Sequence, residues 1–248
     1  MNNSKIKFLN TYVNNVSMKE TLSYIENCIK EDSKKSYIIA VNVDVIIKIE
    51  NDSYLKEIAD NADMVLMDGK PLVWISSLLK TPVKEKISGS DLVPLVCEMA
   101  ANKGYTMFFI GGKEGIADQA KVRLEKQYPQ IKIVGTYAPK FGFEKSEEEL
   151  NKINRMISDV KPDILVVCFG CPKQEKFIYE NIDKYDAKIS ICAGATIDFL
   201  AGNISRAPQW MSNNGLEWFY RFMQEPKRLF RRYFVDDTKI FKLIWKYR

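Results

Sequence analysis

Residues 164–178 read ILVVCFGCPKQEKFI, and residues 189–202 read ISICAGATIDFLAG. Each stretch starts with a short apolar run, passes through a glycine-containing turn and continues with the residue spacing of a helix. Successive strand–turn–helix units are typical of a parallel sheet with helical crossovers. Ligands of such sheets bind beyond the carboxyl ends of the strands, where these two turns would lie. The two stretches therefore predict a ligand site at one edge of a parallel sheet.

The same alternation of apolar runs and amphipathic stretches extends over most of the chain. The expected strands are Tyr37–Val41, Met64–Met67, Thr106–Ile110, Ile131–Val134, Ile164–Phe169 and Ile189–Cys192. The expected helices include Met18–Lys30, Ser90–Asn102, Ile116–Gln127 and Glu147–Val160. This order predicts an α/β fold, with a mainly parallel, Rossmann-like sheet and helices on both faces. A change of composition near Gly202–Pro208 suggests an α/β catalytic core, residues 1–202, and a C-terminal helical, basic appendage, residues 203–248.

The composition restricts the chemistry, because the 248 residues include no histidine. Ser-His-Asp and Cys-His catalysis and the usual histidine-containing zinc sites are thereby excluded. The five cysteines are odd in number and lie mostly in apolar segments, as expected for reduced thiols in the cytoplasm. Cys168 and Cys171 form a single CxxC pair, which does not indicate a metal when no second pair is present. We therefore expect neither a metal nor a cofactor.

Two aspartates follow apolar strands and are candidate acids or bases. Asp68 closes the run Met64–Met67, and Asp198 lies just after Ile189–Cys192. A carboxylate at the ligand edge of a sheet is partly buried, which raises its pKa toward the range of a useful base. The alternative is a structural one, since Asp residues also cap the first turn of helices.

Two further turns carry groups suited to an anion. The turn Gly111-Gly112-Lys113-Glu114-Gly115 begins a helix, and its glycines would let backbone N–H groups approach a phosphate. It matches neither GxGxxG nor a P-loop, so a plain connecting turn is the alternative. Lys173 and Gln174 start another helix, where a lysine opposes the helix dipole. Both side chains are better explained as hydrogen-bond donors to a ligand.

The C-terminal part of the chain carries the positive charge. Residues 221–248 contain nine basic and three acidic residues, a local charge of +6, which leaves −1 for the other 220 residues. Arg228, Arg231 and Arg232 are expected on one helical face. Farther on, one face is expected to hold Lys239, Lys242 and Lys246, and another Ile240, Phe241, Ile244 and Trp245. A basic, aromatic amphipathic helix is typical of a membrane interface.

Several alternatives remain open for this segment. Its apolar face is also compatible with packing on the core, or on a second subunit in a homo-oligomer. Nucleic acid is disfavoured as a partner, because the rest of the chain carries no DNA- or RNA-binding motif. No window approaches 18 consecutive apolar residues, and the first ten residues lack the apolar region of a secretory signal. We expect a cytoplasmic protein that is peripheral on the inner face of the cell membrane.

Taken in order, the motifs resemble the WecG/TagA/CpsF family of bacterial glycosyltransferases (glycosyltransferase family 26). The resemblance runs from about Tyr37 to Tyr233. It rests on Asn42-Val43-Asp44, Asp68-Gly69, Gly89-Ser90-Asp91, the Gly111–Gly115 turn, Gly170-x-Pro-Lys-Gln-Glu175, Asp198-Phe-Leu-Ala-Gly202, Arg206-Ala-Pro208, Gly215-Leu-Glu-Trp218 and Glu225-Pro-x-Arg-Leu229.

The resemblance implies a metal-independent, inverting transferase. Family members move a sugar, often N-acetylmannosamine, from a UDP-sugar donor to an undecaprenyl-diphosphate-linked N-acetylglucosamine acceptor. Its TagA-like members build the linkage unit of wall teichoic acid. The family's proposed base corresponds to Asp68, its pocket glutamine to Gln174, and its functional arginines to Arg221, Arg228 and Arg231. The catalytic candidates are thus Asp68, Lys86, Gln174, Arg221, Arg228 and Arg231, and the substrate-binding candidates are Asn42, Asp91, Gly111, Gly112, Gly115, Lys173, Asp198 and Arg206.

Two positions depart from the family pattern. Ala40 stands where the family often has threonine, and Lys86 stands where it often has arginine. Lysine keeps the positive charge but lacks the two-pronged fork that grips phosphate oxygens. These changes bear on the identity of the sugar, so another UDP-hexose, for capsule or exopolysaccharide, is an alternative donor. A non-catalytic nucleotide-binding module held at the membrane is the alternative from another class, and the missing GxGxxG argues against an NAD enzyme.

Overall fold

The computed structural model describes residues 5–31 and 34–248, so the first four residues of the N-terminal stretch considered above lie outside the described part. The strands are β1 (Lys5–Phe8), β2 (Thr11–Asn14), β3 (Ser36–Val41), β4 (Met64–Met67), β5 (Thr106–Gly111), β6 (Lys132–Tyr137), β7 (Ile164–Cys168) and β8 (Ile189–Cys192). The helices of the core are α1 (Met18–Glu31), α2 (Val43–Asn51), α3 (Ser53–Asn61), α4 (Lys70–Leu78), α5 (Gly89–Lys103), α6 (Ile116–Gln127), η1 (Phe143–Lys145), α7 (Glu147–Val160), α8 (Lys173–Asn181) and α9 (Thr196–Ala201). The C-terminal segment contains α10 (Gln209–Asn213), α11 (Glu217–Gln224), α12 (Pro226–Arg231), the π-helical turn η2 (Arg232–Asp236), η3 (Asp237–Lys239) and α13 (Ile240–Tyr247).

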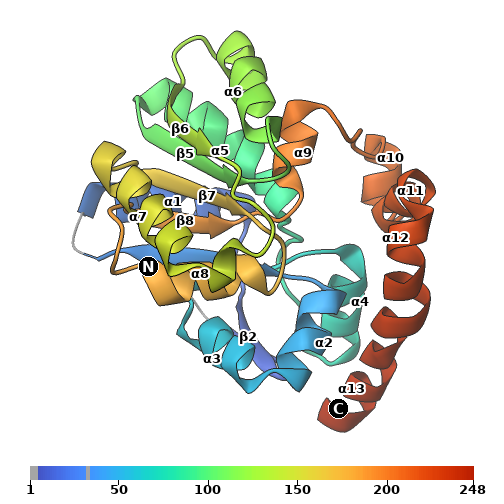
Figure 1. The fold of residues 1–248 in the computed structure, drawn as a ribbon. Helices are drawn as coiled ribbons and strands as arrows, with labels where there is room; N and C mark the ends of the chain where they lie inside the picture. Colours follow the sequence, from blue (N-terminus) through green and yellow to red (C-terminus); the bar gives the residue numbers. More distant parts are fainter. Residues whose placement is uncertain (1–4, 32–33) are drawn as a thin grey trace.

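Six strands form one parallel sheet in the order β4-β3-β8-β7-β5-β6 (Figure 1). All of the expected strands are present, which confirms the α/β fold with a parallel sheet. One face of the sheet packs on α1, α5, α6 and α9, and the other packs on α2, α3, α7 and α8. Because helices cover both faces, β4, β7 and β8 are buried along their whole length. The sequences of β4 and β7 read as unbroken apolar runs, and β8 is apolar except for Ser190, whose hydroxyl is hydrogen-bonded to that of Tyr185.

An antiparallel hairpin, β1–β2, adds to the expected architecture. Its pairing runs from Lys5 opposite Asn14 to Phe8 opposite Thr11. The hairpin is held to the sheet by Asn14, whose Oδ1 accepts a hydrogen bond from the backbone N–H of Val65 at 2.8 Å. Each strand has four residues. Such a short alternation of apolar and polar residues does not distinguish a strand from a loop.

The C-terminal segment runs along one side of the molecule, past α9, α2 and α4 (Figure 1). Leu229, Ile240 and Leu243 anchor it to the core, each with at most 6% of its surface exposed. The expectation that Ile240 and Phe241 share a face is wrong, because Phe241 is 72% exposed and Trp245 83%. Neighbouring residues of a helix differ by about 100° in direction, so one faces the core while the next faces outward. Among the described residues, no helix has the length and apolar character needed to cross a bilayer.

Candidate active site

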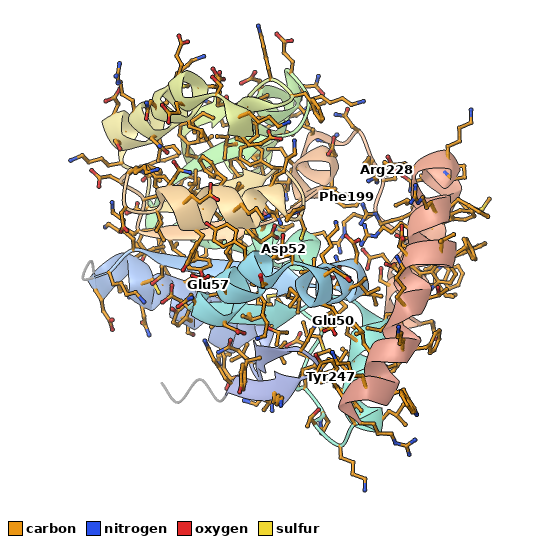
Figure 2. All side chains as sticks on the ribbon, turned by 60° about the horizontal axis from the view of Figure 1, so that its bottom comes forward. Glu50, Asp52, Glu57, Phe199, Arg228 and Tyr247 are labelled. Atoms are coloured by element: carbon orange, nitrogen blue, oxygen red, sulfur yellow. The ribbon has the colours of Figure 1, made fainter. Side chains whose placement is uncertain are left out.

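Two adjoining cavities lie at the carboxyl edge of the sheet, between the core and the C-terminal segment. Figure 2 shows Arg228 of that segment and Phe199 of α9 facing each other across this space. The first, which we call the aromatic cavity, measures about 410 Å³; its lining includes Asp68, Lys70, Pro71, Lys86, Glu217, Trp218, Tyr233, Phe234, Asp237 and Phe241. The second, which we call the polar cavity, measures about 310 Å³; its lining includes Asp44, Asp68, Gly170, Gln174, Gly194, Ala195, Asp198, Phe199 and Arg228.

Certain residues line both cavities and so mark the boundary between them. They are Asn42, Asp68, Ser90, Arg221 and Arg232. The first three come from the core, at or near the ends of β3 and β4 and in the first turn of α5, whereas the two arginines come from the C-terminal segment. The boundary therefore has a carboxylate and an amide on one side and two guanidinium groups on the other.

Asp68 is held in place by its backbone, whose N–H donates to the carbonyl of Val41 at 2.8 Å. Burial raises the pKa of Asp68 to about 6, and the negative charges of Glu217 and Asp91 add to that rise, while Lys86 and Arg221 oppose it. A carboxyl group with this pKa is ionised at neutral pH, yet it holds a proton more readily than an exposed aspartate. Asp68 is therefore suited to accept a proton from a bound hydroxyl group.

Lys86 and Asp91 form the centre of an ion-pair network beside the aromatic cavity. Lys86 Nζ lies 2.6 Å from Asp91 and 3.5 Å from Glu217, and the lysine side chain is only 12% exposed. Asp91 also binds Ser88 and Arg206. Burial works to raise the pKa of Asp91, but the hydrogen bonds from Lys86 and Ser88 outweigh burial and lower it to about 2. Asp91 and Arg206, which we expected to bind substrate, thus pair with each other and join α5 to the C-terminal segment.

Gln174 connects two of the turns that border the polar cavity. Its side-chain Oε1 accepts hydrogen bonds from the backbone N–H groups of Gly170 at 3.2 Å and Gly194 at 2.9 Å. Its Nε2 donates to Glu175 at 2.8 Å, and both side chains are at most 5% exposed. Gln174 therefore holds the β7–α8 and β8–α9 turns together. A direct contact with a ligand stays a prediction.

Two expected anion-binding features lie apart from the cavities. Lys173 pairs with Glu144 at 2.6 Å, and its Nζ sits 4.4 Å from the centre of the Phe141 ring. The Gly111–Gly115 turn follows β5, which is separated from β8 by β7, and neither it nor Lys173 lines either cavity. The role of the Gly111–Gly115 turn in binding phosphate stays a prediction. Close packing already explains Gly111, because a Cβ atom there would lie 2.5 Å from the carbonyl oxygen of Cys168.

We expect Gly111→Ala to destabilise the fold by about 3 kcal/mol or more, because it combines backbone strain at φ +120° with a clash against the β7 backbone. Chemical denaturation measures the change. The matched control is Gly142→Ala, at φ +86° with no atom within 4 Å of the added Cβ, which should cost about 1–2 kcal/mol from strain alone. Equal losses in the two variants would show that the close approach to Cys168 is unimportant.

The three expected arginines of the C-terminal segment differ in position. Arg221 is half-buried, lines both cavities and lies 5.6 Å from the ring of Phe199. Arg228 lines the polar cavity and is held by both carboxylate oxygens of Glu225. Arg231 is 85% exposed, pairs with Asp236 at 3.8 Å and lines neither cavity.

Arg232 and Asp237 are additional cleft residues that the sequence-based site did not include. Arg232 lines both cavities, and Asp237 lines the aromatic one. Burial raises the pKa of Asp237 to about 6, although Arg232 opposes the rise. The sequence does carry a signal for these two residues. Leu229, Tyr233, Ile240 and Leu243 recur at helical spacing and form one core-facing stripe. That stripe brings the intervening Arg232 and Asp237 toward the core.

Asp198 also lines the polar cavity, in the first turn of α9. Burial raises its pKa, as does the nearby Glu225, while Lys113, Arg228 and Arg221 oppose the rise. Together with Asp68 and the arginines, this arrangement offers two adjoining compartments that are chemically suited to two different ligands. A cationic, polar compartment suits an anionic substrate, an aromatic compartment suits a sugar ring or an apolar chain, and a carboxylate lies between them.

Comparison with known proteins identifies the class of protein. The glycosyl transferase WecG/TagA/CpsF family profile matches residues 6–248, and the chain therefore belongs to that family. This confirms the expected enzyme class, a glycosyltransferase. One similar relative is the N-acetylglucosaminyldiphosphoundecaprenol N-acetyl-beta-D-mannosaminyltransferase of Bacillus subtilis (strain 168), 28% identical over 217 residues, which are 88% of this chain and 82% of the relative. The protein of the same name from Bacillus spizizenii is 27% identical over 207 residues, 84% of this chain and 78% of the relative.

Proposed function

We propose that this protein is an inverting, metal-independent glycosyltransferase. It moves N-acetylmannosamine from UDP-N-acetylmannosamine to undecaprenyl-diphosphate-linked N-acetylglucosamine, for the linkage unit of wall teichoic acid. The observation that carries the proposal is the position of Asp68, which lines both cavities. The names of the two Bacillus relatives support the choice of sugar and acceptor, since they specify mannosaminyl transfer to this lipid.

The reaction is a single displacement at the boundary of the two cavities. Asp68 accepts the proton of the acceptor hydroxyl while the hydroxyl oxygen bonds to the anomeric carbon of the donor. The bond from that carbon to the diphosphate breaks, and UDP leaves with the electron pair. The products are the lipid-linked disaccharide, UDP and a protonated Asp68, which returns its proton to water. One base suffices because attack from the opposite face inverts the carbon without a covalent intermediate.

The leaving UDP gains negative charge, which cationic groups of the polar cavity offset. Arg221 and Arg228 are suitably placed, because both line the polar cavity and Arg221 also reaches the boundary with Asp68. Donors fixed around the position where charge develops lower the barrier more than mobile ones do. Within the described ranges, no three His, Cys, Asp or Glu side chains gather in a way that could hold a metal ion. Metal independence itself is implied by the family resemblance and is tested by adding a chelator.

The acceptor is anchored in a lipid bilayer, and an exposed apolar surface supports docking there. On the C-terminal segment Phe241 and Trp245 face outward, 72% and 83% exposed. The neighbouring α4 adds Trp74 and Leu78, 58% and 65% exposed, and the Trp74 ring lies against Gly215. Phe241 also lines the aromatic cavity, so the cavity rim belongs to this surface. A protein peripheral on the inner face of the membrane could thus receive the lipid-linked sugar without extracting its whole chain.

The double substitution Phe241→Ser and Trp245→Ser should weaken binding to anionic vesicles at least about tenfold. Burial of a large apolar side chain contributes about 1.5–3 kcal/mol, and both side chains lose that contribution. Vesicle co-sedimentation measures the effect. The control is Val122→Ser, which removes an apolar side chain that is 65% exposed on α6, far from α13 (Figure 1). Unchanged vesicle binding of the double variant would contradict the proposed docking surface.

The function is tested by incubating the protein with UDP-N-acetylmannosamine and a short-chain polyprenyl-diphosphate N-acetylglucosamine. UDP release that depends on the acceptor, with a lipid product one sugar larger, is the expected result. NMR of the product reports whether the anomeric carbon is inverted, and a chelator arm reports on metal. Binding of UDP without turnover would favour the non-catalytic module. Turnover with UDP-glucose or another UDP-hexose alone would favour a capsule or exopolysaccharide enzyme.

A further inference from the structure

We infer that Arg232 binds the diphosphate of the sugar nucleotide and is the partner of Arg221 in that role. The inference rests on the proposed function, and it assigns a residue outside the set that the family resemblance implies. It is based on the position of the Arg232 guanidinium group beside both cavities and on the lack of close hydrogen-bond partners for its N–H groups among the described residues.

Arg232 lies where the two substrates would meet. Like Arg221, it lines both the polar and the aromatic cavity. Its side chain is 27% exposed, so it is sheltered from bulk water but still reaches the cleft. It occupies the first position of the π-helical turn η2, immediately after α12. Such turns are frequent at functional sites, because they redirect a side chain that a regular helix would place elsewhere.

The hydrogen-bonding capacity of Arg232 is largely unused. A guanidinium carries five N–H donors, and the bond from Arg232 Nη2 to Asn42 Oδ1 is long, at 3.4 Å. Its Nε is buried and lacks a hydrogen-bond partner within the described part of the chain, as does the Nε of Arg221. A sheltered cation with unmet donors is costly for the folded protein. Phosphate oxygens would supply the strong acceptors that both groups lack.

Nearby carboxylates balance the charge of Arg232 without using its donors. Asp44 lies 3.9 Å from Nη2, and Asp237 lies 3.9 Å from Nε. These separations allow attraction but exceed a hydrogen bond. Arg228 differs, because Glu225 already binds it through two nitrogens. Arg231 differs too, because it is 85% exposed. Among these neighbouring arginines, Arg232 therefore has the geometry of a group that awaits an anion.

The test measures UDP binding to the full chain by calorimetry, without lipid. Arg232→Ala should weaken UDP binding at least tenfold. Arg232→Lys should recover part of that loss, because lysine keeps the charge but cannot present two parallel donors. The matched control Lys242→Ala removes one positive charge from an exposed position of α13 and should leave UDP affinity within twofold of the wild type. Thermal unfolding of each variant checks that the fold is retained.

Steady-state kinetics then separate binding from folding. Arg232→Ala should raise the KM for the UDP-sugar and lower kcat, while the KM for the lipid acceptor changes less than twofold. The inference is overturned if wild-type protein transfers sugar but Arg232→Ala or Arg232→Lys binds UDP as the wild type does. It is also overturned if Lys242→Ala loses as much affinity as Arg232→Ala, which would indicate a general charge effect. Failure of the wild type to bind UDP would instead overturn the proposed function.

Discussion

Asp68→Asn should lower the turnover number by at least about 100-fold while UDP still binds. Asparagine has nearly the same shape and keeps one of the two acceptor oxygens, but its NH2 group donates, so the side chain cannot accept the proton of the acceptor hydroxyl. The carboxyl group lines both cavities, and burial raises its pKa to about 6. A loss in kcat with little change in UDP affinity is the signature of a missing base. Steady-state kinetics with the lipid acceptor, together with calorimetry of UDP binding, provide the measurement.

The pH dependence gives an internal check on this assignment. Asp68 must be ionised to act as a base, so activity should fall below a pKa of about 6 and level off above it. The acid limb should disappear in Asp68→Asn. Asp198→Asn is the comparison variant, because Asp198 lines the polar cavity but not the aromatic one. We expect it to lower turnover less than Asp68→Asn does. A near-wild-type rate for Asp68→Asn would transfer the base role to Asp91, Asp198 or solvent.

The parallel sheet was predictable because its physical cause is local. Strands covered by helices on both faces require apolar side chains in both directions, and this requirement leaves continuous runs such as Ile164–Cys168. The turns at the ends of those runs were predictable too, because glycine next to the end of an apolar run is also a local signal. The order of the strands was not, because it depends on crossovers between distant parts of the chain. The turn at Gly111 resembles the turn at Gly170 in sequence, but β5 is farther from the cleft than β7.

Within the site, the aspartate at the end of β4 was predictable, but the orientation of the arginines was predictable only in part. The apolar stripe that continues from Leu229 indicates that Arg232 lies on the core side, and it does not fix which cavity the side chain reaches. Arg231 and Arg232 are adjacent in sequence, and on a helix one residue changes the direction of a side chain by about 100°. The π-helical turn that begins at Arg232 alters the direction again, and no residue type announces such a turn. Lys173 and Gln174 show the same limit. The first pairs with Glu144 outside the cavities, while the second, its neighbour, joins two turns at the cleft.

Removal of residues 203–248 should abolish sugar transfer, by at least about 1000-fold, and also vesicle binding. The segment provides Arg221, Arg228 and Arg232, and it forms one wall of the aromatic cavity. The strands and most of the two buried clusters lie within residues 1–202, so we expect this part to fold. Its stability should fall, because Ile240 and Leu243 belong to one of those clusters. Circular dichroism, vesicle co-sedimentation and the transfer assay measure the three effects.

A shorter deletion, of residues 240–248, distinguishes membrane docking from chemistry. It removes the exposed Phe241 and Trp245, together with the buried anchors Ile240 and Leu243, but keeps Leu229 and all the arginines of the cleft. We expect this variant to lose vesicle binding. Its affinity for UDP should stay within about tenfold of the wild type, because weakening a single hydrogen bond between an arginine and UDP costs about 0.5–1.5 kcal/mol. Full transfer activity in residues 1–202 alone would contradict a role for the C-terminal segment in catalysis. If the shorter deletion bound vesicles normally, the docking surface would have to lie on α4, where Trp74 and Leu78 remain.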